Sequence, residues 1–178
     1  MALFRWLGWR KKAPDGGFVA AAVAQPITLL TTTWDTVIVP KVIAHGVSAN
    51  RDQVLRELAF LMHLGTHFAV LQHRPDQRWA MSVMQACTDG LVRILHREGA
   101  WPTIQGPRLS AEYTERKEQF LSAVEAVADI SGVDELSRPP ARVTASVLFG
   151  SEKVPAEVIE TLGSLFVSQF EYCRQLLS

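Results

Sequence analysis

The chain has 178 residues, the length of one ordinary domain, and its 48% hydrophobic and 20% charged residues are typical of a folded globular protein. Its 18 basic and 18 acidic residues cancel, which argues against general nucleic-acid binding, because that function needs a basic face for the phosphates. Cys87 and Cys173 stand far apart without a CxxC spacing, so the sequence indicates no disulfide framework and fits a reducing compartment.

The charges are unevenly distributed along the chain. Residues 1–109 hold 12 basic and 7 acidic residues, whereas residues 110–178 hold 6 basic and 11 acidic residues. Such a difference favours contact between the halves of one fold, or head-to-tail contact between copies of the chain in a homo-oligomer. Solvated faces that differ in charge are the simpler explanation.

Residues 1–17 are predicted to form a basic and aromatic N-terminal arm, separate from a single domain over residues 18–178. Indole rings prefer the boundary between water and lipid, and arginine and lysine are attracted to anionic headgroups. The arm therefore predicts weak, reversible docking on a membrane surface or on a larger assembly. The alternative is an arm that folds back onto its own domain with its tryptophans buried. The predicted docking residues are Phe4, Arg5, Trp6, Trp9, Arg10, Lys11 and Lys12.

The uncharged stretch over residues 16–34 admits three interpretations. A signal peptide is disfavoured because its apolar run, Phe18–Ala24, has only seven residues. A membrane span is disfavoured because Gln25, Pro26 and four threonines make insertion marginal. We therefore expect a buried segment, with a helix over 18–24 that ends at Pro26. Residues 27–40 are ambiguous, since β-branching favours a strand and apolar spacing favours a helix kinked at Pro40; we expect the helix.

Two long amphipathic helices are predicted at residues 51–73 and 76–98. Asn50 is a good N-cap for the first helix, and Gln53 follows three residues later. Because the break between the two helices is short, we expect an antiparallel hairpin at the centre of the fold. The expected core positions are Val54, Leu58, Leu61, Gly65 and Phe68 in the first helix, and Trp79, Val83, Ala86, Gly90 and Ile94 in the second.

The rest of the chain is also predicted to be helical, with connections at 99–109 and 134–140, where glycine and proline gather. Helices are expected at 110–130, at 141–149 and at 155–177. Their expected inward residues are Tyr113, Phe120, Val124 and Val127 in the first of these helices, and Val158, Leu162, Phe166, Phe170 and Cys173 in the last. The predicted fold is all-α, a bundle of five to six helices.

His63 and His67 are the one histidine pair with metal-ligand spacing, since side chains at i and i+4 share a helix face. The zinc-protease motif HExxH and the di-iron motif ExxH are both absent from the sequence. In the expected hairpin, Met81, Met84 and Cys87 come level with the pair, and such a set suits haem or a transition metal such as copper. The alternative is a pair of histidines in an ordinary helical core.

No catalytic motif accompanies these residues. The sequence has no Gly-x-Ser-x-Gly elbow, no Walker motif and no dinucleotide-binding glycine pattern. Both cysteines fall on apolar helix seams, where a thiol is usually inert. A helix-turn-helix over 141–162 is disfavoured, because Glu152, Glu157 and Glu160 would face the phosphates.

The sequence thus favours a non-enzymatic adaptor of the cytoplasm, peripheral on the inner face of the membrane. Its body would bind partner proteins, and its arm would dock on an anionic membrane surface or a larger assembly. The alternative function is a metal- or haem-binding helical bundle that uses His63 and His67 with a methionine ligand.

Overall fold

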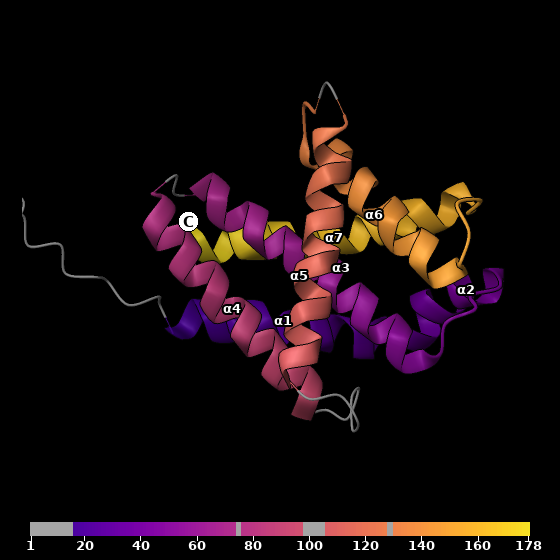
Figure 1. The fold of residues 1–178 in the computed structure, drawn as a ribbon, viewed down its shortest axis with the longest axis horizontal. Helices are drawn as coiled ribbons and strands as arrows, with labels where there is room; N and C mark the ends of the chain where they lie inside the picture. The colour runs from indigo at the N-terminus through magenta and orange to yellow at the C-terminus, as the bar shows by residue number, and fades with distance from the viewer. Residues whose placement is uncertain (1–15, 74–75, 98–105, 128–129) are drawn as a thin grey trace, which may run out of the picture.

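The computed structural model describes residues 16–73, 76–97, 106–127 and 130–178, and over these ranges the chain forms helices and no strands (Figure 1). The predicted all-α bundle is therefore confirmed. The helices are α1 (Gly16–Thr33), a π-helical turn η1 (Trp34–Ile38), α2 (Val39–Lys41), a 3₁₀ turn η2 (Ile43–His45), α3 (Arg51–His73), α4 (Gln77–Arg97), α5 (Gly106–Glu125), α6 (Val133–Phe149) and α7 (Ala156–Leu177).

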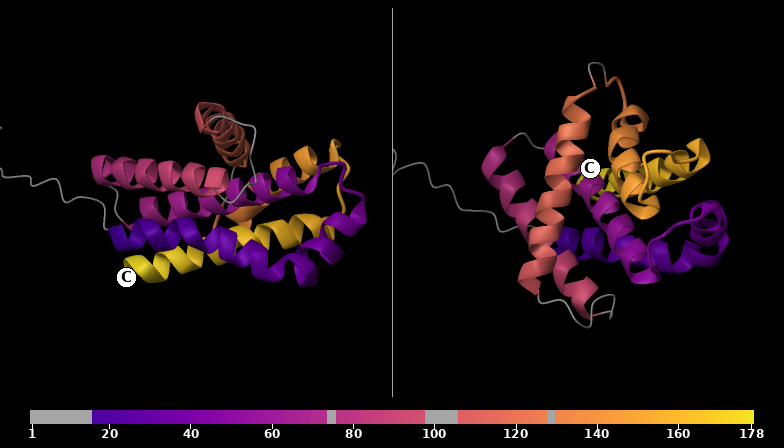
Figure 2. Two further views of the ribbon diagram at one scale, coloured as in Figure 1. Left: turned by 90° about the horizontal axis from the view of Figure 1, so that it is seen from below. Right: turned by 45° about the vertical axis from the view of Figure 1, so that its right-hand side comes forward.

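Helix α3 is the central element of the bundle. Every residue from Glu57 to His67 is buried, because α3 contacts α1, α4, α5, α6 and α7. Its closest neighbour is α7, and Gly65 makes this approach possible: a Cβ atom at Gly65 would lie 2.8 Å from the carbonyl oxygen of Phe166. Helix α5 crosses the other helices steeply and is seen almost end-on in the left view of Figure 2.

Helices α3 and α4 run in opposite directions. The ring of His73, at the end of α3, lies 6.3 Å from that of Trp79, near the start of α4. Further along, the side chain of His63 lies 3.3 Å from that of Thr88. The helices begin and end within a residue of the predicted bounds, 51–73 and 76–98.

The predicted end of the first helix at Pro26 is wrong, because α1 continues to Thr33. A proline lacks the N–H that would bond to the carbonyl four residues earlier, here that of Ala22. In this fold the side-chain Nε2 of Gln169, on α7, donates to the Ala22 carbonyl at 2.9 Å. A residue 147 positions away in sequence thus replaces the bond that Pro26 removes.

The expectation that residues 16–34 are buried holds for only one face of α1. Segment Gly16–His45 is long and apolar enough to cross a membrane, with a mean hydropathy of 1.2, yet only 17% of its most apolar window is buried. The buried residues of α1 are Phe18, Ala22, Val23, Pro26 and Leu30. Helix α3 has a similar mean hydropathy of 1.3 but is 78% buried.

Both predicted connections are partly wrong. Helix α5 begins at Gly106, and α6 begins at Val133 and includes the expected linker over 134–140. In the first turn of α6, the Glu135 carboxylate accepts hydrogen bonds from the backbone N–H and the hydroxyl of Ser131, just before the helix, at 2.7 and 2.8 Å. Gly150 ends α6 in the left-handed conformation, at a φ of 61°, as predicted.

Two predicted core faces are rotated. The buried line of α4 is Ala80, Val83, Cys87, Leu91 and Leu95. It differs from the expected seam because α4 packs against α1 as well as α3, so that Gly90 faces Val23 of α1. Helix α5 ends at Glu125, so the expected inward residue Val127 lies beyond it and is 42% exposed, whereas Tyr113 and Phe120 of α5 are buried as predicted. The five expected core residues of α7 are all buried.

Candidate functional sites

The predicted docking residues of the N-terminal arm, Phe4, Arg5, Trp6, Trp9, Arg10, Lys11 and Lys12, lie outside the described residues. The last two residues of the predicted arm, Gly16 and Gly17, are the first two residues of α1.

Helix α1 presents an uncharged face to solvent. Ala20, Ala24, Thr28 and Thr32 recur at every fourth position and are all exposed. The hydroxyl groups of Thr28 and Thr32 donate to the carbonyls of Ala24 and Thr28, at 3.1 and 2.9 Å. Because these hydroxyls are satisfied within the helix, the face offers methyl groups and few polar groups in need of a partner.

The two histidines of the predicted metal pair lie together in the core. His63 is fully buried and His67 is 6% exposed, and their ring centroids are 4.7 Å apart. Tyr113 of α5 joins them, with its ring centroid 5.3 Å from that of His63 and 6.1 Å from that of His67. The three side chains form a cluster between α3, α4 and α5, which we call the His–Tyr cluster.

Polar groups at the back of each imidazole indicate its tautomer. The Thr88 hydroxyl donates to the Met84 carbonyl at 2.9 Å, so it can only accept from Nε2 of His63, 3.3 Å away. With the Thr88 hydroxyl directed at Met84, the tautomer of His63 that satisfies both groups carries its proton on Nε2. The Met84 backbone lies near His67 and raises the pKa of its ring, and because Nε2 of His67 has no partner, Nδ1 is the ring atom that faces this backbone.

Three polar atoms of the cluster are buried without a hydrogen-bond partner. They are Nδ1 of His63, Nε2 of His67 and the Tyr113 hydroxyl oxygen. The Thr88 hydroxyl lies close enough to lower the pKa of the phenol slightly, although no hydrogen bond of good geometry joins the two groups. Buried polar groups without partners are rare in proteins, and a bound water molecule or ion is one explanation for three of them in one cluster.

Burial keeps the imidazoles neutral. It lowers the pKa of His63 well below the usual value and lowers the pKa of His67 to about 3. The positive charge of Lys117 adds to the effect on both rings. Burial also raises the pKa of the Tyr113 phenol above its usual value. The cluster thus presents two neutral nitrogen lone pairs and one hydroxyl group.

The sulfur ligands expected beside this pair are only partly in place. Met81 is 61% exposed, so its expected position beside the histidines is wrong, whereas Met84 is partly buried and its backbone lies near His67. Burial raises the pKa of the Cys87 thiol to about 12, which leaves it unreactive. Within the described ranges no third His, Cys, Asp or Glu joins the histidine pair. A haem does not fit this tightly packed interior without parting α3, α4 and α5.

A buried ion pair beside the cluster ties α3 to α5, and the sequence reading missed it. Arg116 of α5 donates to both carboxylate oxygens of Glu57, at 2.9 and 3.3 Å. Glu57 is only 3% exposed, and this burial raises the pKa of its carboxyl group. A glutamate within the wide apolar face of α3 was the sequence feature that could have indicated a buried ion pair.

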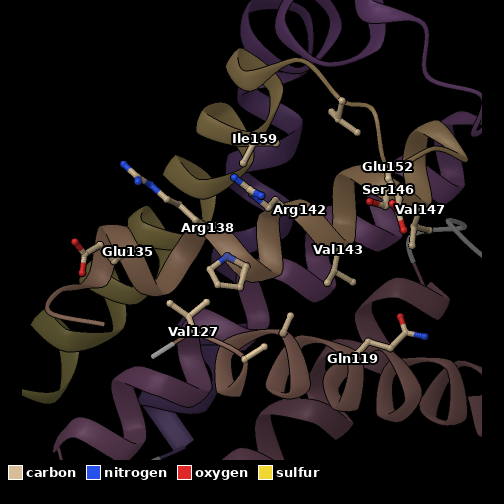
Figure 3. Close-up of a pocket in the computed structure, with 14 residues that line it drawn as sticks. Gln119, Val127, Glu135, Arg138, Arg142, Val143, Ser146, Val147, Glu152 and Ile159 are labelled. Atoms are coloured by element: carbon tan, nitrogen blue, oxygen red, sulfur yellow. The ribbon is translucent and has the colours of Figure 1, made fainter. Parts of the chain in front are cut away.

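A groove of about 1050 Å³ lies between α5 and α6 (Figure 3). Arg138 and Arg142, one helical turn apart, project from α6, while Val143 and Gln119 face the space between the two helices. In the described part of the chain neither arginine makes an ion pair within 4 Å. The groove could not be predicted from the sequence, because residues 134–140 were expected to form a linker and instead belong to α6.

Comparison of the chain with protein-family models, with curated proteins and with solved structures finds no match. The candidate sites therefore stand on their own geometry and chemistry.

Proposed function

We propose that this protein is a helical adaptor that docks on an anionic membrane surface through its N-terminal arm and the exposed face of α1. The observation that carries the proposal is the uncharged, exposed face of α1, which directly follows a segment with four cations and two tryptophans. A cationic aromatic segment next to an apolar helical face is the usual composition of an interfacial membrane anchor.

The expected affinity is modest and depends on salt. Each lysine or arginine near an anionic leaflet contributes roughly 1 kcal/mol, so the cations of the arm together contribute about 4 kcal/mol. Tryptophan rings at the headgroup level add to this, whereas the Ala and Thr side chains of α1 add little apolar area per residue. Docking of this strength is reversible, as an adaptor requires.

The groove between α5 and α6 is the proposed surface for a partner protein. An amphipathic helix fits such a groove, with its apolar side chains against Val143 and Val147 and acidic side chains at its edge toward Arg138 and Arg142; Glu135 and Glu152 line the same groove and favour basic side chains near them. Two guanidinium groups one turn apart match carboxylates with the same spacing on the partner helix.

The test of membrane docking is flotation of the full-length protein with anionic and with neutral vesicles, at low and at high salt. The test variant is R5Q/R10Q/K11Q/K12Q. Its matched control is R78Q/R93Q/R97Q/K153Q, which removes the same charge from exposed positions elsewhere. We expect the wild type and the control to float with anionic vesicles at low salt, and the arm variant to remain in solution. Failure of the wild type to float, or equal flotation of both variants, would contradict the proposal.

A further inference from the structure

We propose that the His–Tyr cluster is a binding site for one divalent transition-metal ion of the kind that prefers imidazole ligands, such as copper or zinc. The ligands are Nδ1 of His63, Nε2 of His67 and the hydroxyl oxygen of Tyr113. These three atoms are buried without partners, on rings whose centroids are 4.7 to 6.1 Å apart.

The polar groups behind the histidines are of the kind that metal ligands have. A metal-bound imidazole almost always donates its other N–H to a carbonyl or another polar group, which fixes the ring and its tautomer. For His63 this polar group is the Thr88 hydroxyl, 3.3 Å from Nε2, and for His67 the nearby polar group is the Met84 backbone. Each ring therefore holds its free lone pair in the core, in the neutral state that metal binding requires.

The phenolic oxygen of Tyr113 is the third ligand atom of the proposed site. On binding, the metal ion replaces the phenolic proton, which is released to solvent, and the resulting phenolate balances one of the two positive charges. The second positive charge of the metal ion is repelled by Lys117, whose ammonium group also lowers the pKa of both imidazoles. The affinity is therefore set by two imidazoles and a phenolate working against one nearby cation.

A single water molecule is the competing occupant of the cluster. Water can donate to the two bare nitrogens and accept from the phenol, and buried waters commonly satisfy three such groups. The two occupants differ in what they predict. A water site takes up no metal, and its stability does not respond to added metal ions.

The test is titration of the chelator-stripped full-length protein with Cu²⁺ and, separately, with Zn²⁺, by calorimetry and absorption spectroscopy. The test variants are H63Q and H67N. The new amide keeps a donor at the place of Nε2 in H63Q and at the place of Nδ1 in H67N. The polar contacts at the back are thus retained, while the bare nitrogens are lost. The control variant is H45Q/H73Q/H96Q, which removes three exposed histidines.

We expect one ion per chain, affinity weakened by about tenfold or more in H63Q and H67N, and unchanged affinity in the control. Copper should give a visible phenolate-to-metal charge-transfer band that Y113F abolishes. K117Q should bind the metal ion more tightly, because it removes the positive charge that repels the ion. Since tighter binding cannot result from loss of folding, this variant keeps the test independent of the core substitutions. Absence of metal uptake by the wild type would overturn the proposal. So would loss of binding in the exposed-histidine control, or no gain in K117Q.

Discussion

Gln169 and Pro26 illustrate how one side chain permits a local exception to the rules of helix formation. The proline removes the hydrogen bond to the Ala22 carbonyl, which is fully buried, and the glutamine amide restores it from another helix. The same amide nitrogen lies 2.9 Å from the Thr66 hydroxyl of α3. One residue thus joins α1, α3 and α7 through polar bonds in an apolar core.

We predict that Q169L lowers the free energy of unfolding by about 1–3 kcal/mol, because it leaves a buried carbonyl without a donor. In the P26A background, the new N–H at position 26 supplies that donor from within α1. The cost of Q169L should therefore be smaller there, by about 1 kcal/mol. Urea unfolding of the two single variants and the double variant measures this coupling.

Gln85 provides the control for that experiment. Its amide donates to Asp89 at 2.9 Å on the exposed face of α4, so Q85L removes a glutamine hydrogen bond without burying an unpaired group. We expect a change of about 0.5 kcal/mol or less. Equal costs for Q85L and Q169L, or additive effects of P26A and Q169L, would mean that the buried bond does not stabilise α1.

At the scale of single elements, the bounds of α3, α4 and α7 could be predicted from sequence because their apolar spacing, caps and breaks agree, although the buried face of α4 could not. Helices α1 and α6 could not be predicted, because their prolines mark helix ends only in the absence of tertiary partners. For Pro26 the partner is Gln169, far along the chain. In α6 both Pro139 and Pro140 are buried, so their rings contribute apolar contacts that offset the lost backbone bonds.

The packing of α3 on α7 depends on the missing side chain of Gly65. Alanine favours a helix over glycine by about 1 kcal/mol, so propensity alone predicts that G65A stabilises the protein. A Cβ atom at this position would lie 2.8 Å from the Phe166 carbonyl oxygen and 3.2 Å from the Phe170 nitrogen, and backbone atoms cannot rotate away. We therefore predict that G65A destabilises the protein by about 1–3 kcal/mol, measured by thermal or urea unfolding.

Gly163 is the matched position on α7. Its added Cβ atom would lie 2.9 Å from the side-chain oxygen of Ser137, which can change rotamer. G163A should accordingly cost less than G65A, since the propensity gain is the same and the obstacle can move. If G65A proved as stable as the wild type, the close approach of α3 and α7 would not limit the packing of the bundle.

The histidine pair of the candidate metal site could be predicted from the spacing of His63 and His67, but Tyr113 and Thr88 could not. Their positions depend on the rotation of α4 and α5 about their axes. That rotation follows from contacts such as Gly90 with Val23 on another helix, which helical periodicity does not contain. Periodicity therefore identified the residues that share a face, but not the residues that meet across two faces.

At the scale of the whole molecule, much of the uncharged surface of α1 is not buried in the core. Only 17% of the apolar window of Gly16–His45 is buried, against 78% for the similarly apolar α3. If the exposed face of α1 contacts a membrane, a charge placed on it should weaken docking without weakening the fold. This separates the contribution of α1 from that of the arm.

We predict that A24E weakens the apparent affinity for anionic vesicles by about fivefold, the factor that corresponds to ~1 kcal/mol for one unfavourable charge at an anionic surface. Ala24 is exposed, so the melting temperature should change little, whereas A22E at a fully buried position should unfold the protein. The control is A111E, which places the same charge on an exposed position of α5. Equal binding of A24E and A111E would remove α1 from the docking surface and leave the arm alone to carry it.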